Sequence, residues 1–250
     1  MNSKIIFLIF SLSIIFSMNG LELATLMESR LKPNDVKSIN TMQLINKDSK
    51  VKILELISIS KDDSEKQMIW FLKPAKDKGT AFLKIEHDVE DDFMSIWLPG
   101  FSRFKRIKSN QTSDSFMGSD LSFEDLTNRT ISDYDYNIKS MNNEKLGDWY
   151  ELESIPKDIA SEYSKHITKV KEIEPGIFLS FEEHSYDKEN KLLKTKIITF
   201  KKIDFYYIMD KLEVENVQKK HSTLLTVNDI SLNNGFKDEK FVQRSLKTLP

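Results

Sequence analysis

Short runs of aliphatic, aromatic and β-branched residues recur along almost the whole chain, separated by Asn, Asp, Gly, Pro and Ser. Runs of this kind between turn residues are typical of β-strands. They predict about a dozen strands, at Val36–Asn46, Val51–Ser60, Lys66–Lys73, Thr80–Glu86, Phe93–Leu98, Phe101–Lys108, Tyr134–Met141, Asp148–Ser154, Lys165–Ile173, Ile177–Tyr186, Leu192–Ile203, Phe205–Asn216 and Ser222–Leu232. Because no Pro-rich or Gly/Ser-rich linker divides them, we expect a single mainly β domain over residues 21–250.

Helical patterns are few. The segment Leu21–Leu31 places its apolar residues near one helical face and ends before a proline. The segment Ser122–Thr127 starts with Ser122 and carries Asp125 three residues later, which is the spacing of a capping box. A further helical turn is predicted at Asp238–Gln243.

Several predicted strands are apolar on both faces. In Met68–Leu72 and Ala81–Ile85, neighbouring positions are apolar where a sheet with one wet face would alternate apolar and polar residues. Something must therefore cover the second face. A sandwich or a filled barrel is the simpler explanation, and an apolar cavity that accepts a ligand is the alternative.

The N-terminus has the pattern of a secretory signal peptide. Lys4 supplies a positive charge, Ile5–Phe16 is apolar, and Ser17–Gly20 offers small or polar residues for cleavage. An uncleaved membrane anchor is the alternative, but about 20 apolar residues are needed to span a bilayer. We expect residues 1–20 to be a cleaved signal peptide and the protein to be exported to the periplasm.

Composition removes several classes of function. The chain has no cysteine, so disulfides, thiolate metal sites and a lipid-modified N-terminal cysteine are excluded. Its net charge of −2 offers no strongly basic face for nucleic acid. The four histidines show no metal-ligand spacing, and we expect neither a metal nor another cofactor.

No catalytic constellation stands out. Gly118-Ser119-Asp120 lacks the histidine pattern of a nucleophilic serine and is interpreted as a turn. A carboxylate pair such as Glu124-Asp125 could serve a secreted hydrolase, although acidic turn residues are usually solvated. We therefore expect a non-catalytic protein, with a hydrolase as a remote alternative.

The stretch Arg103–Lys108 is basic and allows two interpretations. It could contact acidic lipid headgroups or an acidic partner protein. It could also be a solvated strand in which Arg106 pairs with Asp114, Asp120 or Asp125 and holds the following loop in place. The second interpretation is favoured.

Two central segments closely resemble the outer membrane lipoprotein-sorting protein family, a relative of the lipoprotein carriers LolA and LolB. The resemblance rests on Trp97–Pro99 with Arg103–Ile107 and on Asp114–Asp120 with Phe123–Leu126, and extends to Lys73–Ala75, Gly79–Leu83, Trp149–Pro156 and Phe241–Leu246. Trp70 and Ser95 depart from the family pattern, in which a basic and an aromatic residue would be expected.

The resemblance implies a strongly curved antiparallel half-barrel with a few short helices across its concave face. It also implies a cavity for lipid or lipoprotein acyl chains, without catalysis. The Gln111–Gly118 segment is expected to be a pinned turn or a flexible lid over that cavity. A membrane exporter or an outer-membrane acceptor would be a partner of the carrier, which we expect to be a monomer. An accessory module of a membrane lipid exporter or envelope complex is the alternative.

Strand parity then selects candidate ligand-binding residues. The set consists of apolar side chains on the central strands and the loop that follows them: Ile69, Phe71, Leu83, Ile85, Ile96, Leu98, Phe104, Phe116 and Met117.

Overall fold

The computed structural model describes residues 18–87, 89–144 and 147–250. The predicted signal peptide therefore lies outside the described residues, apart from its last three. Among the residues described, no helix is long and apolar enough to cross a membrane.

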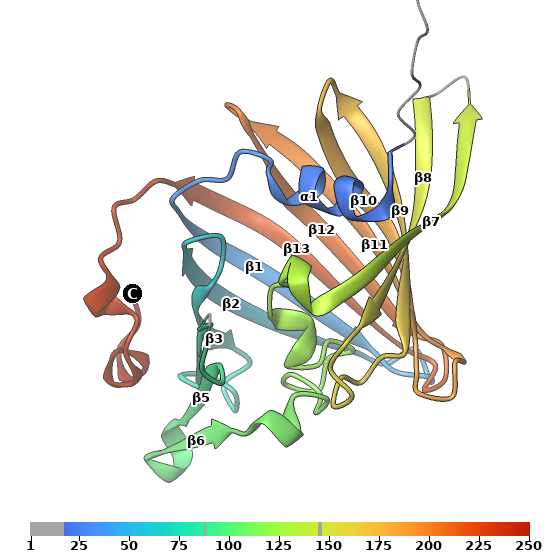
Figure 1. Ribbon diagram of the computed structural model, residues 1–250. Coiled ribbons are helices and arrows are strands. Elements are labelled where there is room, and N and C mark those ends of the chain that lie inside the picture. The colour runs from blue at the N-terminus through green and yellow to red at the C-terminus, as the bar shows by residue number, and fades with distance from the viewer. Residues whose placement is uncertain (1–17, 88, 145–146) are drawn as a thin grey trace, which may run out of the picture.

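Thirteen antiparallel strands form one strongly curved sheet that does not close into a barrel (Figure 1). The strands are β1 (Asp35–Ile45), β2 (Val51–Lys61), β3 (Lys66–Lys73), β4 (Ala81–Ile85), β5 (Phe93–Leu98), β6 (Arg103–Ile107), β7 (Tyr134–Glu144), β8 (Gly147–Pro156), β9 (Lys165–Glu174), β10 (Ile177–Tyr186), β11 (Leu192–Ile203), β12 (Tyr206–Asn216) and β13 (His221–Leu232). Every pair of neighbours in the sheet is also consecutive in sequence, except β1 and β13. The predicted half-barrel is confirmed, with β6 and β7 as its two edges.

The helical segments are short. They are α1 (Gly20–Glu28) and six 3-10 turns, η1 (Pro99–Phe101), η2 (Ser109–Gln111), η3 (Glu124–Leu126), η4 (Ile131–Asp133), η5 (Asp238–Lys240) and η6 (Gln243–Lys247). The predicted strand Phe101–Lys108 begins later than expected, because η1 and the left-handed Ser102 (φ 49°) form the turn before β6. Within the predicted helix Ser122–Thr127, only η3 is helical.

The helix α1 lies across the concave face, over the half of the sheet that holds β7, β8 and β10 (Figure 1). Asn19 and Glu22 form a reciprocal capping box at its start. Its inward face buries Leu23 and Ala24 against apolar side chains of the sheet. A Cβ at Gly20 would lie 2.6 Å from the backbone carbon of Tyr136, so only glycine allows α1 to approach β7 this closely.

The concave face of the other half of the sheet is covered by the loop segment 109–133. Phe116 inserts its ring among Phe71, Phe82 and Phe123, with ring centroids 5.2–5.9 Å apart. Phe116 is 1% exposed, and the same cluster includes Met42 and other side chains of β1 to β6. The loop thus completes an aromatic core on this face.

The outer face of the same strands is covered by the C-terminal segment, residues 236–247. Phe241 and Leu246 pack on Met68 and its neighbours. Trp70 Nε1 donates to the Leu246 carbonyl at 3.2 Å, and Gln243 Nε2 donates to Ser95 Oγ at 2.8 Å. Both departures from the family pattern, Trp70 and Ser95, therefore contact the C-terminal segment.

A carboxylate anchors the start of the C-terminal segment. Asp35 accepts hydrogen bonds from the backbone N–H groups of Asn234, Gly235 and Phe236, at 2.6, 2.8 and 3.0 Å. Although burial alone would raise it, the pKa of Asp35 is lowered by these bonds and by the Asn234 side chain. The strands with two apolar faces thus have a separate cover on each face.

The aromatic core predicts that Phe116→Ala destabilises the fold strongly. Truncation of a buried phenylalanine removes apolar burial and leaves a cavity, at a cost of about 3–5 kcal/mol. Urea unfolding should report this loss. The matched control is Phe101→Ala, because Phe101 is 73% exposed, and its effect should stay within about 0.5 kcal/mol. Equal effects of the two substitutions would contradict the assignment of Phe116 as the central side chain.

Candidate functional site

Two adjoining cavities open on the concave face. Their volumes are about 880 and 250 Å³, and they share lining from Lys32, Asp63 and Arg129 among others. We call the two together the concave cavity. The larger part lies within the range of about 300–1,000 Å³ that is typical of small-molecule sites.

The concave cavity combines polar and apolar lining residues. The large part is lined mainly by polar and charged residues, which include Glu86, Asp92 and Asn128. The small part extends between α1 and the sheet, where Met27 and Phe178 are among several apolar lining residues. A largely polar space with a group of apolar side chains between α1 and the sheet suits an amphiphilic ligand.

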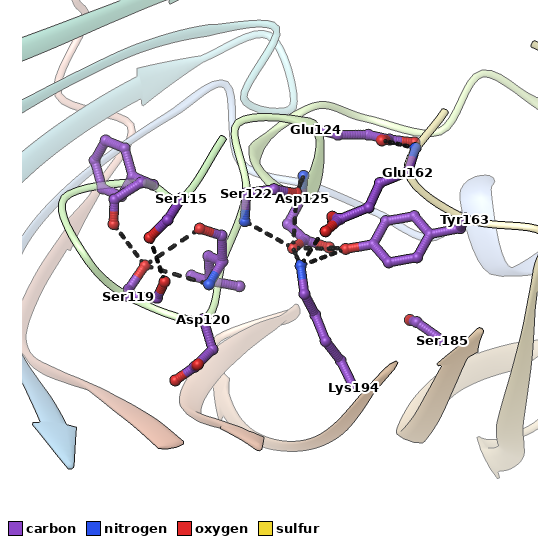
Figure 2. Close-up of polar contacts among 12 residues, drawn as sticks. Ser115, Ser119, Asp120, Ser122, Glu124, Asp125, Glu162, Tyr163, Ser185 and Lys194 are labelled. Carbon is purple, nitrogen blue, oxygen red and sulfur yellow. Dashed lines mark hydrogen bonds and ion pairs between the residues drawn. The ribbon is translucent and has the colours of Figure 1, made fainter. Parts of the chain in front are cut away.

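Beside this cavity, five charged side chains form an ionic cluster: Asp125, Arg129, Glu183, Lys194 and Lys196. Lys194 and Lys196 reach the two carboxylate oxygens of Asp125 at 2.9 and 2.6 Å, as Figure 2 shows for Lys194. Arg129 binds both oxygens of Glu183, at 2.5 and 2.9 Å, and Lys196 lies 3.0 Å from the same carboxylate. The cluster joins the segment 122–129 to β10 and β11.

Hydrogen bonds with Ser122, three residues earlier, hold Asp125 in position for these ion pairs. Its carboxylate accepts from Ser122 N and Oγ, and its own N–H donates to Ser122 Oγ at 3.3 Å, so the predicted capping pair is present (Figure 2). Tyr163 O–H donates to Asp125 at 2.9 Å and accepts from Lys194 Nζ at 2.7 Å. The Asp125 side chain is 1% exposed, and its oxygens are occupied on every side.

The charges in this cluster set its protonation states. Burial alone would raise the pKa of Asp125, but the ammonium groups of Lys196 and Lys194 outweigh it and hold the pKa well below its usual range. Burial would likewise raise the pKa of Glu183, and Arg129 and Lys196 hold it far below normal. Both carboxylates therefore stay ionised at neutral pH.

Two neighbours of the cluster stay neutral. Burial, followed by the positive charge of Arg129, lowers the pKa of His166 well below its ordinary value. Burial and the negative charge of Asp125 raise the pKa of Tyr163 well above 10. The arrangement is thus a fixed set of paired charges with neutral side chains around it.

This geometry argues against the Glu124-Asp125 pair as a hydrolytic centre. Glu124 accepts from Ser161 Oγ at 2.5 Å and from the Glu162 N–H at 2.7 Å, and it ties two loops together. A glycosidase needs a carboxylic acid with a raised pKa, whereas that of Asp125 is lowered. No group of three or more potential metal ligands occurs in residues 18–87, 89–144 and 147–250.

The loop that contains Phe116 is a pinned turn rather than a free lid. The Phe116 N–H donates to the Leu121 carbonyl at 2.7 Å, and Ser115 Oγ donates to the Ser119 carbonyl at 2.6 Å (Figure 2). Asp120, beyond the turn, contacts His221 Nδ1 at 2.7 Å and accepts from Thr223 Oγ1 at 2.7 Å. Of the two expectations for Gln111–Gly118, the geometry supports the pinned turn.

The nine residues selected by strand parity lie on two different faces of the sheet. Six belong to the concave aromatic core: Ile69, Phe71, Ile96, Leu98, Phe116 and Met117. Three lie on the outer face, in the cluster covered by the C-terminal segment: Leu83, Ile85 and Phe104. The sheet therefore does not bring the nine together, and none of them lines the concave cavity.

The split arises from register in β4. Phe82 pairs with Ile69 and Ile96, so it shares the concave face with them, whereas Leu83 pairs with Met68 and Ser95 on the outer face. Parity within one strand cannot reveal this offset between strands. Met27 and Phe178 are among the apolar residues that line the concave cavity. In the sequence, nothing distinguishes them from other apolar residues of a helix or strand.

The predicted pairing of Arg106 with Asp114, Asp120 or Asp125 is wrong. The Arg106 guanidinium lies over the Phe93 ring, 4.5 Å from its centroid, on the outer face of the sheet. The carboxylate of Asp120 instead contacts a residue of β13, and that of Asp125 contacts two residues of β11. The basic strand therefore does not hold the following loop.

Known proteins share this architecture. A family model described as an uncharacterised protein matches residues 63–248. A domain described as an outer membrane lipoprotein-sorting protein, from Vibrio parahaemolyticus, is 28% identical with a TM-score of 0.85 over 92% of this chain and 98% of that one. A DUF1329 family protein from Desulfovibrio piger is 28% identical with a TM-score of 0.82, over 91% and 97%. A LolA superfamily protein from Nitrosomonas europaea, 18% identical with a TM-score of 0.72 over 92% and 100%, shares the fold. No curated protein matches the chain in sequence.

The ionic cluster predicts a specific acid sensitivity. A carboxylate with a lowered folded pKa contributes stability that is fully present above its unfolded pKa, about 4, and is lost as the pH falls towards the folded pKa. The free energy of unfolding should therefore decline as the pH is lowered from about 5 to 2. Asp125→Asn should cost about 3–5 kcal/mol at pH 7 and make that decline shallower.

Urea unfolding at a series of pH values measures both effects. Asp48→Asn is the matched control, because Asp48 is an exposed carboxylate in the turn between β1 and β2. Parallel pH curves for wild type and Asp125→Asn would show that Asp125 does not carry the acid sensitivity.

Proposed function

The chain belongs to the family whose model matches residues 63–248, and from this premise and its likeness to the outer membrane lipoprotein-sorting domain of Vibrio parahaemolyticus we propose that it is a non-catalytic carrier for the acyl chains of a lipid or lipoprotein. The observation that carries the proposal is the concave cavity, whose largely polar lining includes a group of apolar side chains between α1 and the sheet. An acyl chain would occupy the apolar part and leave its polar headgroup among the charged residues.

The energetics favour such a role. Each CH₂ group removed from water contributes about 0.8 kcal/mol, so a long acyl chain carries on the order of 10 kcal/mol. An unshielded chain would cross an aqueous compartment very slowly. A cavity that covers the chain and keeps a polar opening would lower that barrier without any chemical step.

In this proposal, α1 is the part that moves. It has only nine residues, and isolated helices shorter than about 12–15 residues are marginal in water. Its position depends on a small buried face, while Met27 borders the cavity and Leu21 is 53% exposed. Displacement of α1 would open the apolar end, whereas the Phe116 turn would stay in place.

We further infer that the carrier acts in the periplasm as a single domain over residues 21–250, after removal of a signal peptide at residues 1–20. The apolar stretch Ile5–Phe16 after Lys4 supports export. The description of the Vibrio relative, which names the outer membrane, supports an envelope location.

The proposal predicts that Met27→Glu weakens ligand uptake. A carboxylate at the apolar end of the cavity would have to lose its hydration when an acyl chain enters, which is unfavourable. Titration with a fluorescent fatty acid should show affinity reduced by about tenfold or more. Native mass spectrometry of the purified protein should show a copurified lipid.

Met141→Glu is the matched control, because Met141 is 48% exposed on the edge strand β7, away from the residues that line the cavity. Its affinity for the fatty acid should equal that of wild type. A wild-type protein that neither contains lipid nor takes up the fatty acid would overturn the carrier proposal.

A further inference from the structure

We propose that the edge of the sheet at β6 is a docking surface for an anionic phospholipid membrane. The surface, which we call the basic edge, consists of Phe101, Arg103, Lys105, Arg106, Lys108 and Lys247. Strand β6 lies at the periphery of the molecule, at the lower left in Figure 1. All six residues are exposed.

The cations of the basic edge are not neutralised by the protein. In the described part of the chain, no carboxylate forms an ion pair with any of the five. Three of them lie over aromatic rings instead: Arg103 over Phe101 at 5.2 Å, Arg106 over Phe93 at 4.5 Å, and Lys247 over Trp97 at 5.1 Å. Ring stacking positions these cations without cancelling their charge.

The turn at the end of the basic edge is apolar. Phe101 is 73% exposed and follows Pro99 and Gly100 in η1, where the chain reverses between β5 and β6. A large exposed aromatic side chain beside uncompensated arginine and lysine matches the two contributions to membrane-surface binding: insertion at the interface and attraction to anionic headgroups.

The distribution of acidic residues sets the orientation. Asp91 accepts from Ser109 Oγ at 2.9 Å, which places an acidic loop beside the far end of β6, beyond Lys108. The end that carries Phe101 and Arg103 has no such acidic neighbour among the described ion pairs. The turn would therefore face the membrane, with the acidic loop held away from it.

Protection of an edge strand against aggregation is a simpler role for charged residues. That role can be filled by charge of either sign and does not require an exposed phenylalanine at the end of the strand. The other edge, β7, carries charges of both signs, among them Asp135 and Lys139. The combination of one sign of charge with an apolar turn is what favours a membrane.

Lys108 also lines the concave cavity, but Phe101 and the three cations changed in the test, Arg103, Lys105 and Arg106, do not, so the inference stands or falls separately from ligand binding there. The experiment is cosedimentation of the full chain with vesicles of phosphatidylglycerol and phosphatidylcholine, or of phosphatidylcholine alone. Wild type should bind the anionic vesicles far more strongly.

Each cation near such a surface contributes about fivefold, so Arg103→Glu/Lys105→Glu/Arg106→Glu should weaken binding by more than about a hundredfold. Phe101→Ser should weaken it by about tenfold.

Two matched controls test the assignment. Lys50→Glu/Lys219→Glu/Lys220→Glu reverses three exposed charges in the β1–β2 and β12–β13 turns, across the sheet from β6. Phe205→Ser removes a phenylalanine that is 77% exposed in the turn before β12. Both should bind anionic vesicles nearly as wild type does. All variants share the same N-terminal apolar stretch, so its contribution cancels in the comparison.

Several results would overturn the inference. Equal binding of wild type to both kinds of vesicle would do so, and so would a control triple variant that loses as much binding as the β6 triple variant. In the first case charge does not drive docking, and in the second the attraction is diffuse. Uptake of monomeric fluorescent fatty acid should be unchanged in the β6 variants, so a failure of docking and a failure of the carrier proposal give different results.

Discussion

An open sheet of thirteen strands has two faces, and wherever a face is apolar, a chain without a second sheet must cover it with segments from outside the strands. This constraint governs the structure. The helix α1 covers one half of the concave face, the loop segment 109–133 covers the other, and the C-terminal segment covers the outer face of β3 to β5. Because the sheet is covered by three separate segments, a space remains between α1 and the loop segment. This space is the concave cavity.

The loop segment is held in two physically different ways. Phe116 contributes apolar burial and aromatic packing, which are favourable in many orientations. The contacts of Asp125 with Lys194 and Lys196 offset the cost of burying its charge, and they are satisfied in only one placement of the loop. The first interaction holds the loop on the sheet, and the second fixes where it lies relative to the cavity. A binding surface that must keep its shape benefits from both.

The local features of the fold were predictable from the sequence, and the pairings between distant segments were not. Strand runs and the capping pair Ser122 and Asp125 are confirmed, because strand patterns and turn residues act over a few positions. The curved half-barrel, also confirmed, was implied by the family resemblance and not by these local patterns. The face of Leu83 depends on its offset from β3, which no single strand encodes. Nothing in the sequence distinguishes Lys194 and Lys196 from solvated lysines, because their partner, Asp125, lies 69 and 71 positions away. Apolar character on both faces of β3 correctly indicated a second cover, which is the C-terminal segment rather than a ligand cavity.

The C-terminal segment also has a consequence for the order in which the protein can be completed. Met68, Trp70 and Leu83 lie more than 150 positions before Phe241 and Leu246, which cover them, so the covering residues are synthesised much later. Until those residues arrive, the early strands have one apolar face without its native cover, in a state prone to misassociation. The chain therefore gains from remaining unfolded or bound by a chaperone until residues 236–247 are available to cover these strands.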